Sequence, residues 1–546
     1  MKFKKLPVAS HQLPEKFKES FKKILFFLFF VFLFLNIWSK ALVWENGGLY
    51  SSCRNCFGDW SAHITYITSF VYGENFPPQL PILSGHRFSY PFLADFLSAL
   101  FIKLGLSLTA SIIFPGFILS LSLVLLLYAF GKNLTRKINV GILTVFLFLF
   151  NGGLGFWWFL KDIRKTGIVE ILKNLPREYT HLDNIEWINI ITSQLLPQRG
   201  LLLGLLLSVF IYLSLWRTFD KNPKKHLLLA GFIASFLPLI HFHCFAAACF
   251  VAGWLAIYQL ISKKGKLKVF KDWLWFFLPI LSFGLPQVSY FYAEVFQNQS
   301  FLRWQPGWMA EGNVLLFWFK NLGLVLPLAF LGFLKGRKKL KIFSLPFWAL
   351  FFLANLFVFQ PWEWDNMKIF IHWYIVASVL AVIAIVYLLE NRKIFYKILG
   401  ILLFGLSILS GALDVARLMQ YKNHKFLFWS DQQFKLAKWI KQNTNPASVF
   451  LTAGSHNHFL PALTGRKIVL GYEGWLWTYG LEYDQRKKDI AQIFKTADKT
   501  LLGKYNIDYI FIGSDEKRQG ANEKSFEENF ETILDEGGNK IYKVTQ

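Results

Sequence analysis

Residues 53–81 read CRNCFGDWSAHITYITSFVYGENFPPQLP, and they come shortly after an apolar run at 23–44, KILFFLFFVFLFLNIWSKALVW. The apolar run is long enough to cross a bilayer as one helix. The stretch behind it places an aspartate, Asp59, and a histidine, His63, close to one end of that span. Their interpretation depends on which side of the membrane they face, so the topology of the whole chain is needed first.

The composition is that of a protein with many membrane spans. Of 546 residues, 54% are hydrophobic, 18% are aromatic and only 17% are charged. A water-soluble chain of this length needs far more polar surface. The net charge of +25 does not indicate a nucleic-acid partner, because Lys and Arg fall in short clusters between apolar runs, as the positive-inside rule expects. We therefore predict a mostly α-helical, multi-pass protein of the cell membrane.

Five basic loops orient the predicted bundle with their positive charge in the cytoplasm. They separate eleven predicted spans and put the N-terminus inside and the C-terminus outside. The segment at 1–23 is basic and the apolar run behind it is too long for a signal-peptide core, so we predict a retained first span. The basic loops lie at 131–137, 216–226, 263–271, 335–341 and 391–397. The predicted spans lie near 24–44, 108–130, 138–160, 199–216, 226–241, 244–262, 272–294, 313–334, 343–360, 369–389 and 396–418.

One apolar segment does not fit this alternation. Residues 90–105, YPFLADFLSALFIKLG, are short and carry Asp95 and Lys103. Counting them as a span would place two basic loops outside. We predict an interfacial or re-entrant helix there, within a large first outer loop at 45–107.

The chain after about residue 424 has a different character. Charged residues become frequent, 431–443 has helical periodicity, and 448–452 and 508–513 are short β-branched or aromatic runs. We predict two domains, a membrane domain at 1–424 and an extracytoplasmic α/β domain at 425–546. The tail is expected to pack over the outer mouth of the bundle, with SHNHF at 455–459 and GYEGWLWTYG at 471–480 facing a cavity.

The first outer loop begins with a predicted helix that carries the most interesting polar residues. Asp59, His63 and Tyr66 fall on one face, next to an apolar stripe at helical spacing. A helix lying on the outer leaflet would present the carboxylate and the imidazole above the hydrocarbon. The alternative is that Asp59, which follows a glycine, is an ordinary N-cap. The apolar stripe consists of Trp60, Ile64, Ile67 and Val71.

No metal site or cofactor is predicted. Cys53 and Cys56 form a CxxC, but no second pair exists to complete a zinc site. Outside the cytoplasm they either close a small disulfide or remain two unpaired thiols, and the sequence leaves both alternatives open. His241 and His243, at an outward apex between two spans, are more typical of satisfied polar residues than of ligands. Motifs of nucleotide-driven transport and of serine or zinc hydrolysis are absent from the sequence.

Further polar residues fall at the outer boundary of the predicted spans. Cationic and amide side chains at that depth suit the phosphate of a lipid head group. The alternative is that they are anchors that snorkel to the interface. The candidate substrate-binding residues are His86, Arg87, Gln198, Arg199, Asp365 and Lys368.

A first span, a large outer loop opening with GDWSAHI, and then YPFLADFLSALFIKLG together resemble the GT-C superfamily of membrane glycosyltransferases. In the tail, residues 436–474, LAKWIKQNTNPASVFLTAGSHNHFLPALTGRKIVLGYEG, are similar to the start of the outer domain of oligosaccharyltransferase-type proteins. The resemblance implies transfer of a sugar from a polyprenyl-phosphate carrier to an unidentified acceptor outside the cytoplasm. It implies that Asp59 is catalytic, and we expect His63 to orient it or the acceptor.

The chain departs from this family pattern at two points. The first loop has no D-x-D or paired acidic residues, and the W-W-D signature of an oligosaccharyltransferase is missing. We therefore expect a metal-independent hexosyl or pentosyl transferase with a single-sugar donor. The alternatives are a transporter or flippase of a lipid-linked glycan, which needs a polar path through the spans, and a non-catalytic membrane protein with an outer binding domain.

Overall fold

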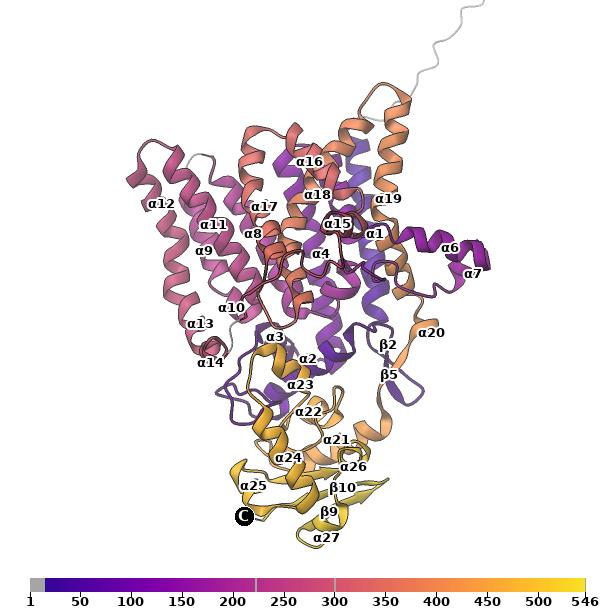
Figure 1. Cartoon of the computed structure of the whole chain (residues 1–546), viewed down its shortest axis with the longest axis vertical. Helices are drawn as coiled ribbons and strands as arrows, with labels where there is room; N and C mark the ends of the chain where they lie inside the picture. Colours follow the sequence, from indigo (N-terminus) through magenta and orange to yellow (C-terminus); the bar gives the residue numbers. More distant parts are fainter. Residues whose placement is uncertain (1–14, 221–222, 299–300, 546) are drawn as a thin grey trace, which may run out of the picture.

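The computed structural model describes residues 15–220, 223–298 and 301–545 and has two parts stacked end to end (Figure 1). A bundle of long helices forms one part, and a smaller α/β domain made by the end of the chain forms the other. The predicted fold class, a mostly helical polytopic bundle followed by a small α/β domain, is confirmed. Most of the basic N-terminal segment lies outside the described residues.

Within the described residues, eight helices are long and apolar enough to cross a membrane, and a bent pair raises the number to nine. The bent pair is α15 (Val314–Leu322) and α16 (Val325–Lys335), which meet at 88°. The eight are α1 (Glu15–Ser39), α4 (Leu108–Thr135), α8 (Arg199–Arg217), α11 (Phe242–Ser262), the continuous run of α12 (Lys266–Pro279), η2 (Ile280–Gly284) and α13 (Leu285–Phe291), α17 (Lys338–Leu356), α18 (Met367–Leu389) and α19 (Ile394–Met419).

This number is smaller than the eleven spans predicted, because two predicted spans consist of short helices. In the first, α5 (Ile138–Leu149) has only 12 residues, and a glycine-rich turn then leads into α6 (Phe156–Thr166). The turn packs so closely that a Cβ on Gly155 would lie 1.6 Å from the backbone oxygen of Tyr179.

The second short region contains α9 (Lys224–Ala234) and α10 (Leu237–Ile240). The 11 residues of α9 reach about 16 Å, roughly half of the hydrocarbon thickness. Figure 1 shows α9 and α10 following one another from the far end of the bundle toward the α/β domain, so the predicted alternation of the loops is retained.

The five basic turns gather at the end of the bundle remote from the α/β domain. Figure 1 shows the turns between α8 and α9, α11 and α12, α16 and α17, and α18 and α19 at this end. The turn between α4 and α5 joins them, because Lys137 forms an ion pair with Glu390 at the end of α18. The basic loops thus share one side, as the charge pattern predicts.

Large apolar side chains point outward along the bundle. On α1, for example, Leu28, Phe32 and Leu35 are 57%, 66% and 55% exposed. A soluble protein does not leave such continuous apolar surface in water, whereas a bilayer covers it at no cost. The chain is a multi-pass membrane protein.

Helix α18 runs through the middle of the bundle, and 94% of its apolar window is buried inside the protein. It packs against α5, α16, α17 and α19, so that every side of the helix is covered. A helix that is apolar all round is the sequence expected for that position. Its first turn therefore holds Lys368 at a fixed place in the bundle.

The first outer loop and the tail form one structure. β1 (Val43–Glu45) and β2 (Gly48–Ser51) extend into a three-stranded sheet with β5 (Phe426–Ser430) of the tail. The predicted interfacial segment is α3 (Leu93–Lys103), whose 11 residues are too few to span a bilayer, and it packs on α2, α4 and α8.

Helix α2 (Cys56–Tyr72) does not lie on the outer leaflet, so that prediction is wrong. Nearly all of its residues are buried, between α3 on one side and α22 (Phe459–Thr464) of the tail on the other. The turn after α22 allows this close packing, because a Cβ on Gly465 would lie 2.3 Å from the backbone oxygen of Thr68. The residue that follows, Arg466, donates a hydrogen bond of 2.7 Å to the carbonyl of Tyr72. Tail packing thus buries the helix that carries Asp59.

The tail is an α/β domain with a five-stranded mixed sheet in the order β7-β6-β8-β10-β9. β6 is parallel to β7 and β8, and β10 is antiparallel to β8 and β9. The helix predicted at 431–443 is α21, which begins with a capping box at Ser430. The tail elements are α21 (Asp431–Asn443), β6 (Val449–Leu451), α22, β7 (Lys467–Ile468), α23 (Glu473–Tyr479), α24 (Asp484–Thr496), α25 (Lys499–Lys504), β8 (Tyr509–Ile512), α26 (Ser514–Arg518), α27 (Glu523–Glu527), β9 (Glu531–Glu536) and β10 (Asn539–Lys543).

Short elements connect the long helices on the side of the tail. Two of these short elements are used below, the π-helix η1 before α8 and the 3-10 helix η3 before α18. The short elements of the membrane part are α7 (Ile168–Lys173), η1 (Ile191–Leu195), α14 (Ala293–Asn298), β3 (Arg303–Trp304), β4 (Phe357–Val358), η3 (Glu363–Asn366) and α20 (Tyr421–His424).

Candidate active site

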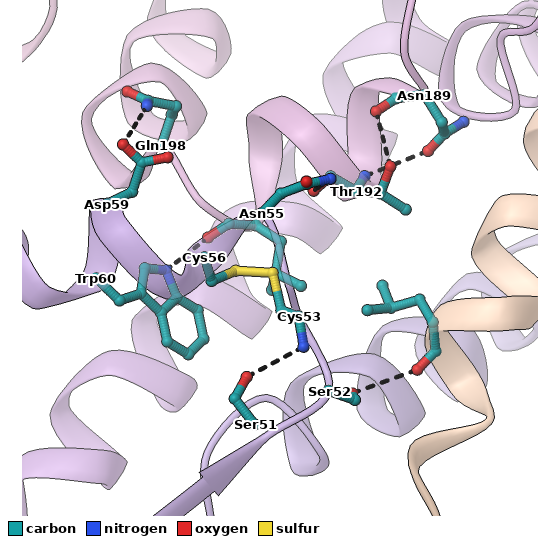
Figure 2. The surroundings of a disulfide bond; sticks show 12 residues. Ser51, Ser52, Cys53, Asn55, Cys56, Asp59, Trp60, Asn189, Thr192 and Gln198 are labelled. Atoms are coloured by element: carbon teal, nitrogen blue, oxygen red, sulfur yellow. Dashed lines mark hydrogen bonds between the residues drawn. A yellow bond between two sulfur atoms is a disulfide. The ribbon is translucent and has the colours of Figure 1, made fainter. Parts of the chain in front are cut away.

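The start of α2 is fixed by several contacts, which Figure 2 shows. Cys53 and Cys56 are joined by a disulfide, which decides between the two alternatives left by the sequence. Asn55 donates a hydrogen bond of 3.3 Å to the carbonyl of Thr192 in η1. Trp60 donates one of 3.0 Å from its indole nitrogen to the carbonyl of Leu196. The first turn of α2 is thereby tied to the entrance of α8.

Asp59 is not the N-cap of this helix, so the capping alternative is wrong. The helix begins at Cys56 with Asn55 at the cap position, which puts Asp59 a full turn inside. Its carboxylate accepts a hydrogen bond of 2.8 Å from the side-chain amide of Gln198 (Figure 2). Because the carboxylate satisfies no helix terminus, its position is not explained by helix capping.

Burial in the protein raises the pKa of Asp59 above the ordinary value of a carboxyl group. Positive charge at His63 and Lys368 lowers the pKa in opposition, whereas the negative charge of Asp365 raises it further. The carboxyl group of Asp59 is therefore close to two groups contributed by the start of α18. A carboxylate with a raised pKa is a stronger base than an exposed one.

His63 is held by a buried ion-pair chain behind it. Its Nδ1 lies 2.8 Å from a carboxylate oxygen of Asp95, which is fully buried on α3. The other oxygen of Asp95 lies 3.5 Å from the guanidinium of Arg199, which also donates a hydrogen bond to Ser98. The contacts from Arg199 through Asp95 to His63 fix the orientation of the His63 ring, as a carboxylate does for a functional histidine in many sites.

The start of α18 supplies a second pair of charges. The ammonium group of Lys368 lies 3.0 Å from a carboxylate oxygen of Asp365, and both side chains are largely buried. The turn that carries them is fixed by Asn366, whose amide donates hydrogen bonds of 2.9 and 2.7 Å to the carbonyls of Ala354 and Phe357. The pair is therefore held on the rigid central helix of the bundle.

These groups converge on one cavity of about 1340 Å³ between the bundle and the tail. Asp59, His63, Gln198, Asp365 and Lys368, five of the eight residues predicted for the site, line it. Its charged lining is balanced, with the cations Arg54 and Lys368 and the anions Asp59 and Asp365.

The other three predicted residues are not among the residues that line the cavity. Arg199 is occupied by Asp95 behind the wall. The guanidinium of Arg87 stacks 4.9 Å from the ring centre of Tyr290, and His86 lies 3.6 Å from Glu294.

The deep wall of the cavity is apolar. It is contributed by α11 and α17, which are both membrane-spanning helices. The cavity therefore joins charged groups at the outer boundary to an apolar groove between α11 and α17. This shape suits an amphiphile with a long hydrocarbon chain. The apolar residues of this wall are Ala246, Ala247, Phe250, Leu350 and Leu353.

Two histidines lie between the charged and apolar walls. His241, just before α11, has a buried Nδ1 with no hydrogen-bond partner, and its ring centre lies 5.3 Å from that of His243. Burial lowers the pKa of His241 well below its ordinary value, and the charge on Lys368 contributes to this. A neutral ring of this kind can donate one N–H to an anion in the cavity.

The tail contributes the opposite wall, which is aromatic. Residues from both stretches predicted to face a cavity line it, namely His456 from 455–459 and Tyr472, Trp475, Trp477, Thr478 and Tyr479 from 471–480. The phenol of Tyr479 bonds to that of Tyr66 on α2 at 2.8 Å. A Cβ on Gly58 would lie 2.1 Å from the ring of His456, so the glycine before Asp59 permits this contact. The predicted contact between tail and first loop is confirmed.

Sequence reasoning missed Arg54, Tyr90 and Gln360, which also line the cavity. Tyr90 stacks on Tyr479 with ring centres 4.6 Å apart, and Gln360 bonds to His243. Only long-range packing brings these residues together, and the sequence carries no local signal for them. Within the described residues, no group of three or more His, Cys, Asp or Glu side chains is arranged to hold a metal ion.

Comparison with known proteins identifies the fold. No model of a protein family matches the chain, and no curated protein matches it in sequence. Among solved structures, it resembles the oligosaccharyltransferase of Archaeoglobus fulgidus tethered to an acceptor peptide, with a TM-score of 0.50 at 9% identity over 96% of this chain and 74% of that one. It also resembles ArnT of Cupriavidus metallidurans bound to undecaprenyl phosphate, with a TM-score of 0.50 at 10% identity over 95% of this chain and 97% of that one. The chain has the GT-C fold predicted from its sequence.

Proposed function

We propose that this protein is a glycosyltransferase that moves a single sugar from a polyprenyl-phosphate carrier to an acceptor on the extracytoplasmic face of the membrane. The observation that carries the proposal is a cavity that contains both Asp59 and Lys368 at the outer end of an apolar groove. The cavity joins a base, a cation and a lipid-sized groove, which are the parts such a reaction needs. The GT-C fold agrees with this assignment.

The donor enters with its hydrocarbon chain between α11 and α17 and its phosphate toward Lys368. The apolar groove between α11 and α17 accommodates the hydrocarbon chain of the donor. The ammonium group of Lys368 and the N–H of His241 hold the phosphate. ArnT, which shares the fold, was crystallised with undecaprenyl phosphate, a carrier lipid of this class. His86, Arg87 and Arg199 take no part in this arrangement.

The reaction is a displacement at the anomeric carbon of the donor. An acceptor hydroxyl oxygen forms a bond to that carbon, and the bond from the carbon to the phosphate oxygen breaks. The electron pair of the broken bond stays on the phosphate, and the acceptor proton passes to the carboxylate of Asp59. The raised pKa of Asp59 favours this proton transfer, while Lys368 stabilises the charge that develops on the leaving polyprenyl phosphate.

The supporting residues keep this geometry. Gln198 orients the Asp59 carboxylate by its hydrogen bond, and Asp95 orients His63. His63 lines the cavity beside Asp59 and is assigned to hold the acceptor or the base in place. The cationic charge on the phosphate comes from Lys368, and metal independence is part of the proposal, to be checked by full activity in the presence of EDTA.

The acceptor approaches along the aromatic wall of the tail. Trp477 of this wall is 41% exposed, and Trp362, which lines the cavity from the loop before η3, is 46% exposed. Aromatic faces of this kind stack well on the C–H faces of sugar rings. The tail and first loop are assigned to the extracytoplasmic side, and the N-terminus to the cytoplasm, because the basic turns gather at the opposite end.

The deciding experiment measures sugar release and transfer by the purified full-length protein. A panel of hexose and pentose donors on polyprenyl phosphate is supplied in detergent, with and without candidate glycan acceptors. We expect turnover with one donor, loss of turnover in Asp59→Asn, and normal turnover in Asp183→Asn, which changes an exposed carboxylate outside the cavity. Transport of an intact lipid-linked sugar across vesicles without its cleavage would instead identify a flippase.

A further inference from the structure

A second cavity lies at the end of the bundle remote from the tail. It has a volume of about 580 Å³ and is formed by the last turns of α4, α8, α16 and α18 and the first turns of α5 and α17. Helix α18 connects the two cavities, with Lys368 in the first and Ile383, Val386 and Tyr387 in the second. The proposed transfer reaction makes no use of this second cavity, which we call the basic cavity.

The lining of the basic cavity carries a large excess of positive charge. Among the residues described at this cavity, two carboxylates, Asp220 and Glu390, face seven cationic side chains. The outer cavity differs, since its four charged groups balance. An excess of this size on a concave wall attracts a polyanion or a phosphate group. The cations are Lys132, Arg136, Lys137, Arg217, Lys335, Arg337 and Lys339.

The two carboxylates neutralise only some of these cations. Lys137 pairs with Glu390, and Lys339 lies 2.9 Å from Asp220. The side chains of Arg136 and Arg337 form no ion pair or hydrogen bond with any residue that the structure describes. Both arginines line the cavity, so two planar guanidinium groups remain available to bind a phosphate in bidentate fashion.

The inner wall of the basic cavity is apolar and its rim is aromatic. Leu134, Val140, Leu340, Ile383 and Val386 form the apolar side. At the rim, the ammonium groups of Lys335 and Lys339 lie 3.7 and 4.1 Å from the ring centres of Tyr387 and Trp216. Trp and Tyr with Lys at a membrane boundary are typical of the level of lipid head groups. A ligand for this wall therefore has an apolar chain next to its anionic group.

We propose that the basic cavity binds the phosphate head group of an anionic phospholipid from the leaflet opposite the proposed reaction. The head group contacts Arg136 and Arg337, and the start of an acyl chain lies along α18. Basic pockets between membrane helices recognise lipids in this way. The positive-inside rule alone does not account for the site. Residues 262–268, at the junction of α11 and α12, carry four lysines, as many as line the basic cavity, and none of them lines it.

The test compares matched variants of the full-length protein. Arg136→Gln/Arg337→Gln removes the two unpaired guanidinium groups, and Lys264→Gln/Lys268→Gln removes two exposed charges from the turn at 262–268 at the same end. Each protein is placed in phosphatidylcholine nanodiscs doped with phosphatidylglycerol, and retained lipid is counted by native mass spectrometry. All four side chains are exposed, so each double variant is expected to fold, which circular dichroism verifies.

We expect the wild-type protein and the lysine variant to retain one phosphatidylglycerol. The arginine variant should bind it about 25-fold more weakly, from about 5-fold for each charge near a membrane surface. Equal retention of phosphatidylglycerol by the two variants would overturn the proposal. Retention of phosphatidylcholine by the wild-type protein as strongly as phosphatidylglycerol would also overturn it. Displacement of the lipid by glycerol 3-phosphate at equal concentration would also overturn it, since the site would then be one for a soluble phosphate. None of these readouts requires transferase activity.

Discussion

The two cavities at the ends of α18 differ in the balance and the exposure of their charged groups. In the outer cavity, Asp365, Lys368 and Asp59 each have a partner and are buried or partly buried, whereas Arg54 at its edge is exposed. In the basic cavity, Arg136 and Arg337 are exposed and have no side-chain partner among the residues that the structure describes. One helix therefore connects a balanced, enclosed site with a surplus of charge at the surface.

Under the two proposals made above, this difference separates the transfer reaction from lipid binding. Chemistry needs groups fixed before the reaction, in an enclosed place where their interactions are strong. Binding of a head group needs net charge at an accessible surface, where salt screens it. The outer cavity satisfies the first requirement and the basic cavity satisfies the second. Variants at either end should therefore affect one property and leave the other unchanged.

The largest effect is expected from Asp59→Asn. The asparagine still accepts a hydrogen bond from Gln198, so folding and membrane insertion should be preserved. Loss of the general base should lower the transfer rate by about 100- to 10,000-fold. Initial rates with the donor that the panel selects measure this, with Asp183→Asn as the control. Turnover within a few-fold of wild type would show that Asp59 is structural.

The second effect concerns one lysine from each cavity. Lys368→Gln should lower kcat/KM by about 10- to 100-fold, because a hydrogen bond to a charged group contributes about 1.5–3 kcal/mol. Lys339→Gln, at the other end, should leave kcat/KM unchanged and affect only lipid retention. An equal loss of kcat/KM in both variants would remove the distinction between the cavities.

The sequence predicted those features of the two ends that depend on neighbouring residues, and not those that depend on contacts between distant residues. The basic loops are local features of the sequence, and the structure places them at one end of the bundle, as predicted. The position of Asp59 behind the first span is also local, and its side chain lines the outer cavity. The predictions that failed depend on contacts between residues far apart in the sequence. Arg199 is a surface cation in the sequence, but it is paired to Asp95, a residue 104 positions away.

The burial of α2 was also beyond reach of a local pattern. The helix has the stripe of a surface helix, and it is covered only because the turn at Gly465 brings the tail against it. The predicted span at 138–160 is divided into short helices for a related reason, since the glycines near Gly155 end an apolar run through close backbone packing. In both places a glycine permits a contact whose partner the sequence does not reveal.

The third effect is a shift in the pH dependence of transfer. Asp59 acts as a base only when ionised, so kcat/KM should rise as the pH increases through its raised pKa. The negative charge of Asp365 raises this pKa, so Asp365→Asn should move the acidic limb to lower pH. The pH profile of kcat/KM measures the shift. Asp220→Asn in the basic cavity should leave the limb in place, and a shift there would contradict the electrostatic separation of the two ends.

The smallest effect should come from the disulfide, which crosslinks the outer side while the basic cavity has no cysteine in its lining. Cys53→Ser/Cys56→Ser opens a loop of four residues, and the chain-entropy relation gives about 2 kcal/mol for its closure. Asn55 and Trp60 still hold the first turn of α2 by hydrogen bonds, so the loss of activity should be only a few-fold. Thermal unfolding and initial rates measure the two quantities, and phosphatidylglycerol retention at the other end should not change. If activity falls as far as in Asp59→Asn while the protein remains folded, the disulfide itself positions the base. The rigidity of the outer cavity then comes from the covalent link and not from the helix contacts.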